Sequence, residues 1–361
     1  MAVEIVGFSV DRPRPARGST ILEVRDLHTE FDTEQGIVHA VDGVTFDVKA
    51  GETLAIVGES GCGKTVTALS ILGLLPHRQG RISGGQVLFH GVDLVPMTTK
   101  QLNAIRGDRI AMIFQDALTA LNPVYRVGGQ IAEMIRAHRG VTKQEARERA
   151  IELLDLVGIP NAPRRAQDYV HQFSGGMRQR AMIAMAIALE PEILIADEPT
   201  TALDVTVQAQ ILDVVQEIGE RMDMAIILIT HDLGVVARIA DRVMVMYAGR
   251  HVETAATHDI YHAAKHPYAW GLLESMPRVD AETGKQLHQI GGAPPSLINP
   301  PRGCRFAPRC AYTQTICEAE YPEPQVVGES SVVCHFAARP DWNAHLDPTE
   351  LRASLTRETG L

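Results

Sequence analysis

The sequence predicts an α/β fold with a mixed sheet, a helical subdomain and a small, loop-rich C-terminal extension, on the basis of three observations. The apolar run 54–57 precedes a glycine-rich octet and then a helix-like stretch. A second apolar run, 193–196, ends in two acidic residues. Strand and helix patterns alternate over residues 20–70 and again over 190–250, which is typical of α/β proteins with parallel strands.

The octet at residues 58–65, Gly-Glu-Ser-Gly-Cys-Gly-Lys-Thr, fits the pattern G-x-x-x-x-G-K-[ST] of a phosphate-binding loop. Its glycines let successive backbone N–H groups point at phosphates, and a helix that begins near Lys64 adds its positive dipole end. Lys64 would reach the β- and γ-phosphates of ATP, and Thr65 would give its hydroxyl to Mg²⁺, which prefers hard oxygen ligands. The expected nucleotide contacts are Gly58, Ser60, Gly61, Cys62, Gly63, Lys64, Thr65 and Val66.

Asp197 and Glu198 directly follow the second apolar run. Residues 193–196 have the pattern of a buried parallel strand, and open α/β sheets bind their ligands at the carboxyl ends of such strands. We therefore expect Asp197 to lie on the magnesium side of the site. Glu198 would lie beside the γ-phosphate, where a carboxylate can act as the general base toward the attacking water.

From about residue 20 to residue 255 the chain resembles the ATP-binding subunits of ABC transporters, with the landmarks of that family in their usual order. The stretch Phe173-Ser174-Gly175-Gly176-Met177 resembles the signature motif, with phenylalanine where many members have leucine. A serine and two glycines at a helix start form a second anion-binding nest. The resemblance implies that Ser174, Gly175 and Gly176 contact the γ-phosphate of the opposite subunit, so that one chain holds half of each site.

Four further positions match landmarks of the family. Gln115 matches a glutamine that would join the magnesium site and report the nucleotide state to the membrane subunits; taken alone, it is an ordinary polar residue after a strand. His231, after the apolar run 224–229, matches the switch histidine that holds the γ-phosphate. Asp204 ends Thr201-Ala202-Leu203-Asp204, which resembles the loop through which two ATPases sense each other. Phe31 is the candidate for stacking on adenine, with a core position on the first sheet as the alternative.

The composition predicts a globular chain with more than one structural unit. Its 361 residues exceed the usual size of one core, and 45% hydrophobic with 22% charged residues is ordinary for soluble proteins. The longest apolar stretch, Ala181–Leu189, is shorter than the ~20 residues of a membrane span, and the N-terminus has an early acid and no signal-peptide core. We expect a cytoplasmic protein, and the net charge of −10 argues against nucleic acid as its main partner.

The middle of the chain has helical character, because residues 101–106 and 143–157 carry apolar residues at helical spacing. After Glu253 the composition changes, and prolines interrupt regular structure. The expected units are an N-terminal extension at 1–19, an ATPase domain at 20–255 with its helical subdomain at about 100–190, and the C-terminal extension at 256–361.

Four of the five cysteines lie in the C-terminal extension, separated by five, six and sixteen residues: Cys304, Cys310, Cys317 and Cys334. Disulfides are rare in cytosolic proteins, so this clustering suggests a metal site. The C-x-x-C pairs typical of structural zinc are absent, and ligation by four thiolates suits an iron-sulfur cluster. Zinc, and free thiols that only pack, remain open alternatives. We interpret Cys62 as neither a ligand nor a nucleophile.

The C-terminal extension resembles that of the ATPases of dipeptide, oligopeptide and nickel importers, through His266-Pro267-Tyr268 and residues 303–310. In some of these proteins four cysteines hold a [4Fe-4S] cluster, which here would act as a folding staple. The resemblance implies the energy-coupling ATPase of a peptide importer, peripheral on the cytoplasmic face of the membrane. Its partners would be a second, homologous ATPase subunit, two permeases and an extracytoplasmic peptide-binding protein. Transport of nickel or another small solute, and a soluble ABC ATPase acting on ribosomes or DNA, are the alternatives.

Overall fold

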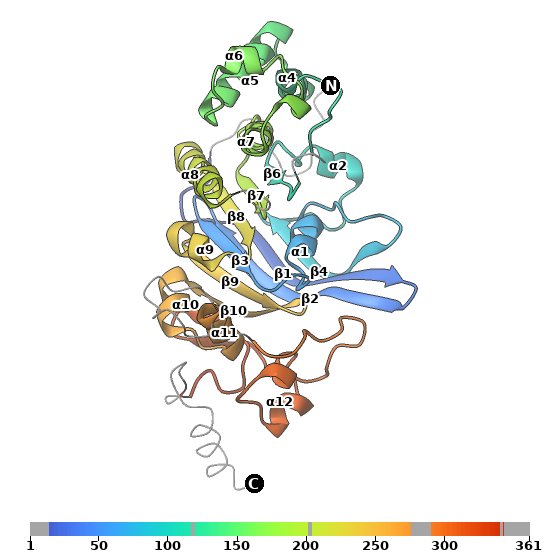
Figure 1. The fold of residues 1–361 in the computed structure, drawn as a ribbon. Helices are drawn as coiled ribbons and strands as arrows, with labels where there is room; N and C mark the ends of the chain where they lie inside the picture. Colours follow the sequence, from blue (N-terminus) through green and yellow to red (C-terminus); the bar gives the residue numbers. More distant parts are fainter. Residues whose placement is uncertain (1–13, 117–119, 201–203, 276–289, 340–341, 343–361) are drawn as a thin grey trace.

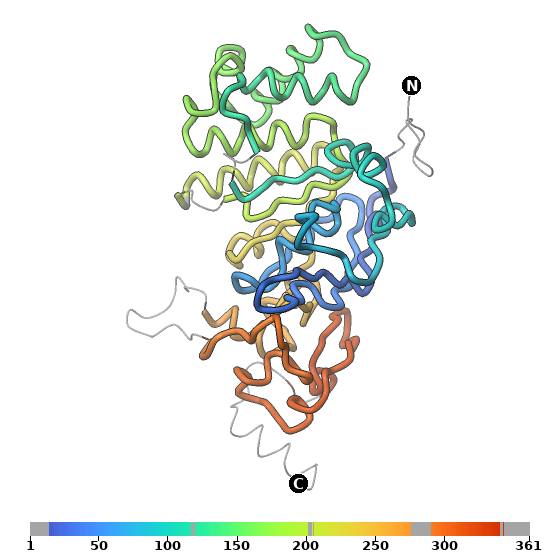
Figure 2. The backbone as a smooth tube through the Cα atoms, turned by 90° about the vertical axis from the view of Figure 1, so that its right-hand side faces the viewer, coloured from blue at the N-terminus to red at the C-terminus, as the bar shows by residue number. Residues whose placement is uncertain are grey.

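The computed structural model describes residues 14–116, 120–200, 204–275, 290–339 and 342. Two β-sheets form the centre of the molecule, with a group of helices at one end and the C-terminal extension at the other (Figure 1). The view from the side shows the same order, with the extension below the sheets (Figure 2).

The N-terminal sheet has four strands in the order β2-β1-β4-β5, and all neighbouring pairs are antiparallel. Along one strand, Val44, Phe46 and Val48 are buried and share a hydrophobic cluster with residues of the second sheet. Burial of alternate residues is what a sheet with one solvated face requires. The strands are β1 (Thr20–Thr33), β2 (Gly36–Lys49), β4 (Gly80–Phe89) and β5 (Val92–Asp93).

The second sheet has eight strands in the order β11-β12-β10-β9-β3-β8-β7-β6. The strands from β9 to β6 run parallel, and β10, β12 and β11 are added antiparallel, so the sheet is mixed, as predicted. The apolar runs 54–57 and 193–196 are confirmed as strands. The strand bounds are β3 (Thr53–Val57), β6 (Ile110–Ile113), β7 (Ile193–Asp197), β8 (Ala225–Thr230), β9 (Arg242–Tyr247), β10 (Arg250–Ala256), β11 (Gln325–Val327) and β12 (Ser330–Val332).

Both faces of the parallel strands are covered, which explains their continuous apolar runs. On β7, Ile193 and Ile195 belong to the cluster shared with the N-terminal sheet and the first helix. Leu194 and Ala196 belong to the cluster shared with the helical group. The strand that ends in Asp197 is therefore held from both sides, and its end is fixed in position.

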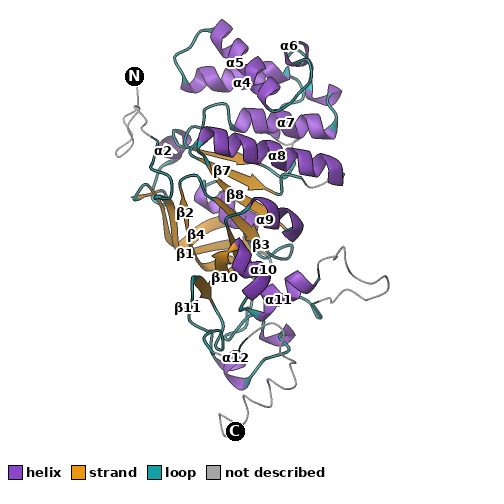
Figure 3. Ribbon diagram, turned by 90° about the vertical axis from the view of Figure 1, so that its left-hand side faces the viewer, coloured by secondary structure: helices purple, strands orange, loops and turns teal. Residues whose placement is uncertain are grey.

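Helices α4 to α7 form the helical group, and α8 lies between them and the sheet (Figure 3). The helix predicted at 143–157 is α5, which begins with a capping box between Thr142 and Glu145. The helix predicted at 101–106 begins earlier, at Thr99, because Thr98 caps it, and it ends at Asn103. Beyond that end, Arg106 donates to the carbonyl oxygen of Leu72 at 2.8 Å. The bounds are α1 (Lys64–Ile71), α2 (Thr99–Asn103), α4 (Val127–His138), α5 (Lys143–Leu156), α6 (Ala162–Arg165), α7 (Gly175–Ala186), α8 (Val205–Met222) and α9 (Leu233–Ile239).

The C-terminal extension joins the second sheet directly, because β12 pairs with β10. Trp270, Phe306 and Trp342 also share a hydrophobic cluster with Val243 and Val245 of β9. Its helices are α10 (Thr257–Ala263), α11 (Pro267–Glu274) and α12 (Thr315–Ala319). In the part of the chain that the structure describes, every helix is too short or too polar to cross a membrane.

Candidate functional site

The phosphate-binding loop connects β3 to α1. Lys64 is the first residue of α1, and its side chain is buried. Its Nζ donates hydrogen bonds to the carbonyl oxygens of Gly58 at 2.8 Å and Glu59 at 3.1 Å. The loop therefore curls around the lysine ammonium group, and the N-terminus of α1 lies at its end. This is the geometry of an anion-binding site.

Two glycines make this curl possible. Gly58 has a φ of +154°, and a Cβ there would lie 2.2 Å from the carbonyl oxygen of Met246. Gly63 has a φ of +106°, and a Cβ there would lie 2.4 Å from the carbonyl oxygen of Ala40. A side chain at either position would displace the backbone of the loop. Cys62 is buried beside them, and burial raises the pKa of its thiol, so it packs as a neutral group.

Thr65 and Asp197 meet at the carboxyl end of the parallel strands. The Thr65 hydroxyl donates to Asp197 Oδ1 at 3.1 Å, and Asp197 is buried. Burial raises the pKa of Asp197 to about 6, and the Thr65 hydrogen bond opposes this rise. The structure thus brings together a hydroxyl and a carboxylate, which are the two kinds of oxygen ligand that suit Mg²⁺.

Glu198 is in contact with two further predicted residues. Gln115 Nε2 donates to Glu198 Oε2 at 2.9 Å, and His231 Nδ1 lies 3.5 Å from Glu198 Oε1. The pairing of Asp197 with Ile229 between β7 and β8 explains this proximity, since the residues after both strands share one edge. Glu198 has a φ of +44°, which is uncommon outside glycine, and its N–H donates to the carbonyl oxygen of Ile229 at 2.9 Å.

The predicted nucleotide contacts outside residues 58–66 lie on other elements. Ser174 caps α7 and accepts from the N–H of Met177 at 3.4 Å, so Gly175 and Gly176 form the first turn of that helix. Asp204 caps α8 and accepts from the N–H of Val207 at 3.0 Å. Phe31 lies in β1, and its ring would meet a Cβ placed at Gly80 at 2.9 Å. Thr201, Ala202 and Leu203 lie outside the described residues.

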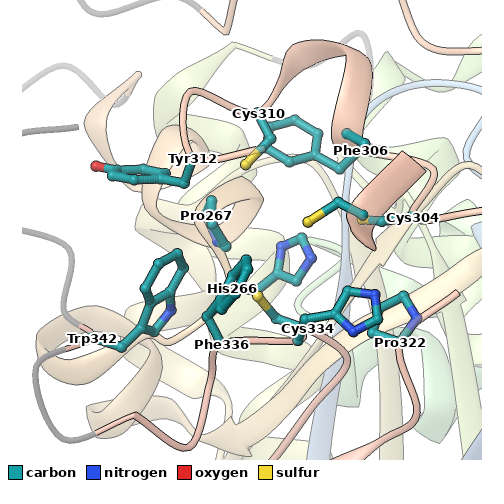
Figure 4. A pocket seen from close by; sticks show the side chains of 13 residues that line it. His266, Pro267, Cys304, Phe306, Cys310, Tyr312, Pro322, Cys334, Phe336 and Trp342 are labelled. Atoms are coloured by element: carbon teal, nitrogen blue, oxygen red, sulfur yellow. The ribbon is translucent and has the colours of Figure 1, made fainter. Parts of the chain in front are cut away.

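The four cysteines of the C-terminal extension line one small pocket. Figure 4 shows the sulfur atoms of Cys304, Cys310 and Cys334 turned toward the same space, with His266 beside them. The pocket is lined by His266, Pro267, Cys304, Phe306, Ala307, Cys310, Tyr312, Cys317, Pro322, Cys334, His335, Phe336 and Trp342. Backbone hydrogen bonds hold this arrangement; for example, the Cys304 N–H donates to the carbonyl oxygen of Cys317 at 2.7 Å.

All four of these cysteines are free thiols. Burial raises the pKa of Cys304, Cys317 and Cys334. Within the described residues, no three or more Cys, His, Asp or Glu side chains are arranged to hold a metal ion. The four thiols therefore share one pocket, and the structure assigns no metal to them.

Two residues of the C-terminal extension lie at the phosphate-binding loop, and no sequence pattern predicts either contact. Arg309 forms an ion pair with Glu59 of the phosphate-binding loop, and Tyr268 accepts a hydrogen bond from the Glu59 N–H. Both lie in the stretches that suggested the importer branch, 266–268 and 303–310. Arg309 beside Cys310 is visible in the sequence, but its partner Glu59 lies 250 positions away, so no local pattern predicts the ion pair.

The order of these groups along the chain, with the helical group inserted between β6 and β7, defines the class of the protein as an ABC-type ATPase. The ABC transporter family model matches residues 41–201. A solved structure of the ATP-binding cassette MJ0796, dimeric and bound to ADP and Pi, aligns with a TM-score of 0.59 and 28% identity. That alignment covers 66% of this chain and 99% of the cassette.

Two relatives extend the match into the C-terminal extension. The dipeptide transport ATP-binding protein DppD of Bacillus subtilis (strain 168) is 52% identical, over 87% of this chain and 93% of that protein. The oligopeptide transport ATP-binding protein OppD of Salmonella typhimurium (strain LT2) is 50% identical, over 86% and 91%. The model of the oligopeptide/dipeptide transporter C-terminal region matches residues 252–317. The chain belongs to the ABC transporter ATP-binding family, in the branch that carries this C-terminal region.

Proposed function

We propose that the chain is the energy-coupling ATPase of an importer for dipeptides or oligopeptides, peripheral on the cytoplasmic face of the cell membrane. One observation carries this proposal: relatives named for dipeptide and oligopeptide transport match over more than nine tenths of their own length, C-terminal region included. Nickel or another small solute as cargo remains the alternative, because cargo is selected by other subunits.

The site residues take the following roles in this proposal. Lys64 and the loop N–H groups would bind the β- and γ-phosphates, and Thr65, Asp197 and Gln115 would hold Mg²⁺. The hydrogen bond between Thr65 and Asp197 supports the first two of these magnesium ligands, and Gln115 is bonded to the adjacent Glu198. Mg²⁺ bound there would neutralise charge on the phosphate oxygens. Glu198 orients and deprotonates the attacking water, and His231, whose Nδ1 lies 3.5 Å from Glu198 Oε1, holds the γ-phosphate.

Two chains complete each site in this mechanism. Ser174 and the first turn of α7 lie in the helical group, away from α1 (Figure 1). They would bind the γ-phosphate held by the phosphate-binding loop of a second ATPase subunit, and Asp204 would lie near the same interface. The dimeric structures of the cassette MJ0796 support this arrangement. We infer a homologous partner subunit, two permeases and an extracytoplasmic peptide-binding protein as the rest of the assembly.

Substitution of Glu198 by Gln tests the chemistry. The amide keeps the shape and the contact with Gln115 but loses the basic oxygen, so turnover should fall by about 10²- to 10⁴-fold while ATP still binds. Glu148, on the surface of α5, provides the control, since Glu148→Gln should hydrolyse ATP as the unchanged protein does. Normal turnover by Glu198→Gln would remove Glu198 from the mechanism. Co-purification of the intact complex with two permeases tests the transport assignment.

We further propose that the four pocket cysteines hold a [4Fe-4S] cluster, with zinc as the alternative. The four thiols have the ligand chemistry of such a cluster and line one pocket with aromatic rings and prolines, although the described side chains are not spaced as a metal site in this structure. The cluster would staple an extension that is mostly loop between residues 291 and 339. Iron, acid-labile sulfide and zinc should be measured on anaerobically purified protein, together with Cys310→Ser. About four irons per chain, lost in that variant, is the expected result; one zinc or no metal would remove the cluster.

A further inference from the structure

Arg309 makes an unusually complete set of contacts with the phosphate-binding loop. Its Nη1 and Nη2 donate to the two carboxylate oxygens of Glu59 at 2.7 and 2.9 Å, in the bidentate geometry that arginine favours. The Arg309 side chain is only 4% exposed. Its remaining donors are also used, on the Tyr247 hydroxyl at 3.3 Å and on the carbonyl oxygens of Gly291 and Ile290 at 2.9 and 3.1 Å.

Tyr268 holds the same loop residue from its backbone side. The Tyr268 hydroxyl oxygen accepts a hydrogen bond from the Glu59 N–H at 2.9 Å. Tyr268 is fully buried, and its ring packs against Tyr247 and Phe306 with centroids 4.5 and 5.4 Å apart. A hydroxyl on so tightly packed a ring has little freedom to follow the loop, so it fixes the position of the N–H that it binds.

Glu59 is thus held at three points. Its carboxylate is bound by Arg309, its N–H by Tyr268, and its carbonyl oxygen accepts from Lys64 Nζ at 3.1 Å. The first two contacts come from the C-terminal extension, and the third comes from the residue that would bind phosphate. Two contacts that hold Glu59 in the loop therefore come from residues distant in the sequence, since Tyr268 lies 209 and Arg309 250 positions away from Glu59.

We propose that Arg309 and Tyr268 are positioning residues for the phosphate-binding loop, through which the C-terminal extension sets the affinity for nucleotide. Neither residue touches the nucleotide in this proposal. They act by holding Glu59, and so the loop backbone, in the curl that binds phosphates. The inference rests on residues 58–65 being the nucleotide site, as proposed above.

The contact also connects the cysteine pocket to the loop. Arg309 immediately precedes Cys310, and Arg305 immediately follows Cys304. Arg305 is buried and donates to Asp42 and to the carbonyl oxygen of Ala248, so both arginines between these two cysteines reach the ATPase domain. Because each arginine is next to a pocket cysteine, an ordered pocket would also fix Arg305 and Arg309, which hold the C-terminal extension to the ATPase domain.

The test measures the affinity of the full-length protein for a fluorescent ATP analogue with Mg²⁺, and KM and kcat for ATP. Arg309→Met and Glu59→Gln should each weaken binding and raise KM by about tenfold, as expected for loss of one charge-assisted contact behind the site. The kcat at saturating ATP should change far less. The double variant should bind no more weakly than the worse single variant, because both remove the same contact. Arg309→Lys should recover part of the affinity.

Three further variants keep the result interpretable. Tyr268→Phe removes one oxygen atom, and Glu59→Gln leaves the C-terminal extension unchanged, so the test survives if Arg309→Met does not fold. Arg242→Met breaks a different ion pair, with Asp47 and Glu52, and should bind the analogue as the unchanged protein does.

Lys64→Ala should abolish binding. If it does so while Arg309→Met, Glu59→Gln and Tyr268→Phe all bind normally, the positioning role is wrong and the nucleotide site stands. Normal binding by Lys64→Ala would overturn the nucleotide site itself.

Discussion

Asp42 of β2, like Glu59, is a carboxylate that ties the ATPase domain to the C-terminal extension, and its replacement by Asn should lower the free energy of unfolding. Its Oδ2 accepts from Arg250 Nε and Nη2 at 3.0 and 2.9 Å and from Arg305 Nη2, and its Oδ1 lies 2.9 Å from His28 Nδ1. Burial disfavours the charge of Asp42, but Arg305 and Arg250 outweigh this and hold its pKa below the ordinary value. The carboxylate therefore stabilises the fold in its ionised form.

The magnitude follows from what the substitution leaves behind. Removal of one partner of a buried ion pair costs about 3–5 kcal/mol, and Asn keeps a neutral acceptor, so we expect a loss of about 2–3 kcal/mol. Arg305 is only 5% exposed and would carry most of the uncompensated charge. Because the folded-state pKa of Asp42 is lowered, this stability is present above the unfolded value of 3.8 and disappears as the pH falls through the folded pKa.

Urea-induced unfolding at pH 7, followed by tryptophan fluorescence, measures this loss. Asp26→Asn is the matched control, because Asp26 also contacts His28 but is 78% exposed, and it should change stability by less than about 0.5 kcal/mol. The double variant with Arg305→Met should be less destabilised than the sum of the single variants. An Asp42→Asn protein that unfolds at the same urea concentration as the unchanged protein would refute the reasoning.

Two further predictions concern protonation and packing. Burial, and to a lesser degree Arg250, lowers the pKa of His251 to about 4, so the fold requires its neutral form. Stability should fall by about 3 kcal/mol as the pH drops from 6.5 to about 4, and His251→Asn should flatten this part of the urea-unfolding profile; an unchanged profile would contradict it. A Cβ at Gly303 would lie 2.2 Å from the carbonyl oxygen of Cys317. If the pocket holds the proposed cluster, Gly303→Ala should therefore lower the metal content, whereas Gly291→Ala, with open space around it, should not. Equal metal in both variants would show that the pocket tolerates the shift.

The parts of the fold that the sequence predicts well are those with a local signal. The run 54–57, the octet after it and the helix from Lys64 lie next to one another in the chain, so hydrophobic pattern and glycine spacing suffice. The helix at 143–157 has a similar local signal, with Thr142 and Glu145 forming its capping box. The end of α2 was predicted less well, because the contact of Arg106 with the carbonyl oxygen of Leu72 has no signal in the helical pattern.

The candidate site divides in the same way. The contact between Thr65 and Asp197 joins two motifs that each lie at the carboxyl end of a parallel strand. Since these ends meet at one edge of the sheet, the two motifs predict the contact. The roles of Ser174 and Asp204 stay predictions, since they depend on a second subunit. Neither the pairing of Arg309 with Glu59 nor that of Asp42 with Arg305 could be found, because a charged residue has many candidate partners in the sequence.

The C-terminal extension is therefore best understood as part of the ATPase domain. It adds β12 to the central sheet, it shares the cluster that contains Trp270 and Val245, and it supplies Arg309 to the phosphate-binding loop. Between residues 291 and 339 it is mostly loop, so we expect it to bury little apolar surface without the sheet and to depend on these contacts for its order. If Arg309 positions the phosphate-binding loop as proposed, disorder in the pocket should weaken nucleotide binding, because Arg309 directly precedes Cys310 and pairs with Glu59 of the loop.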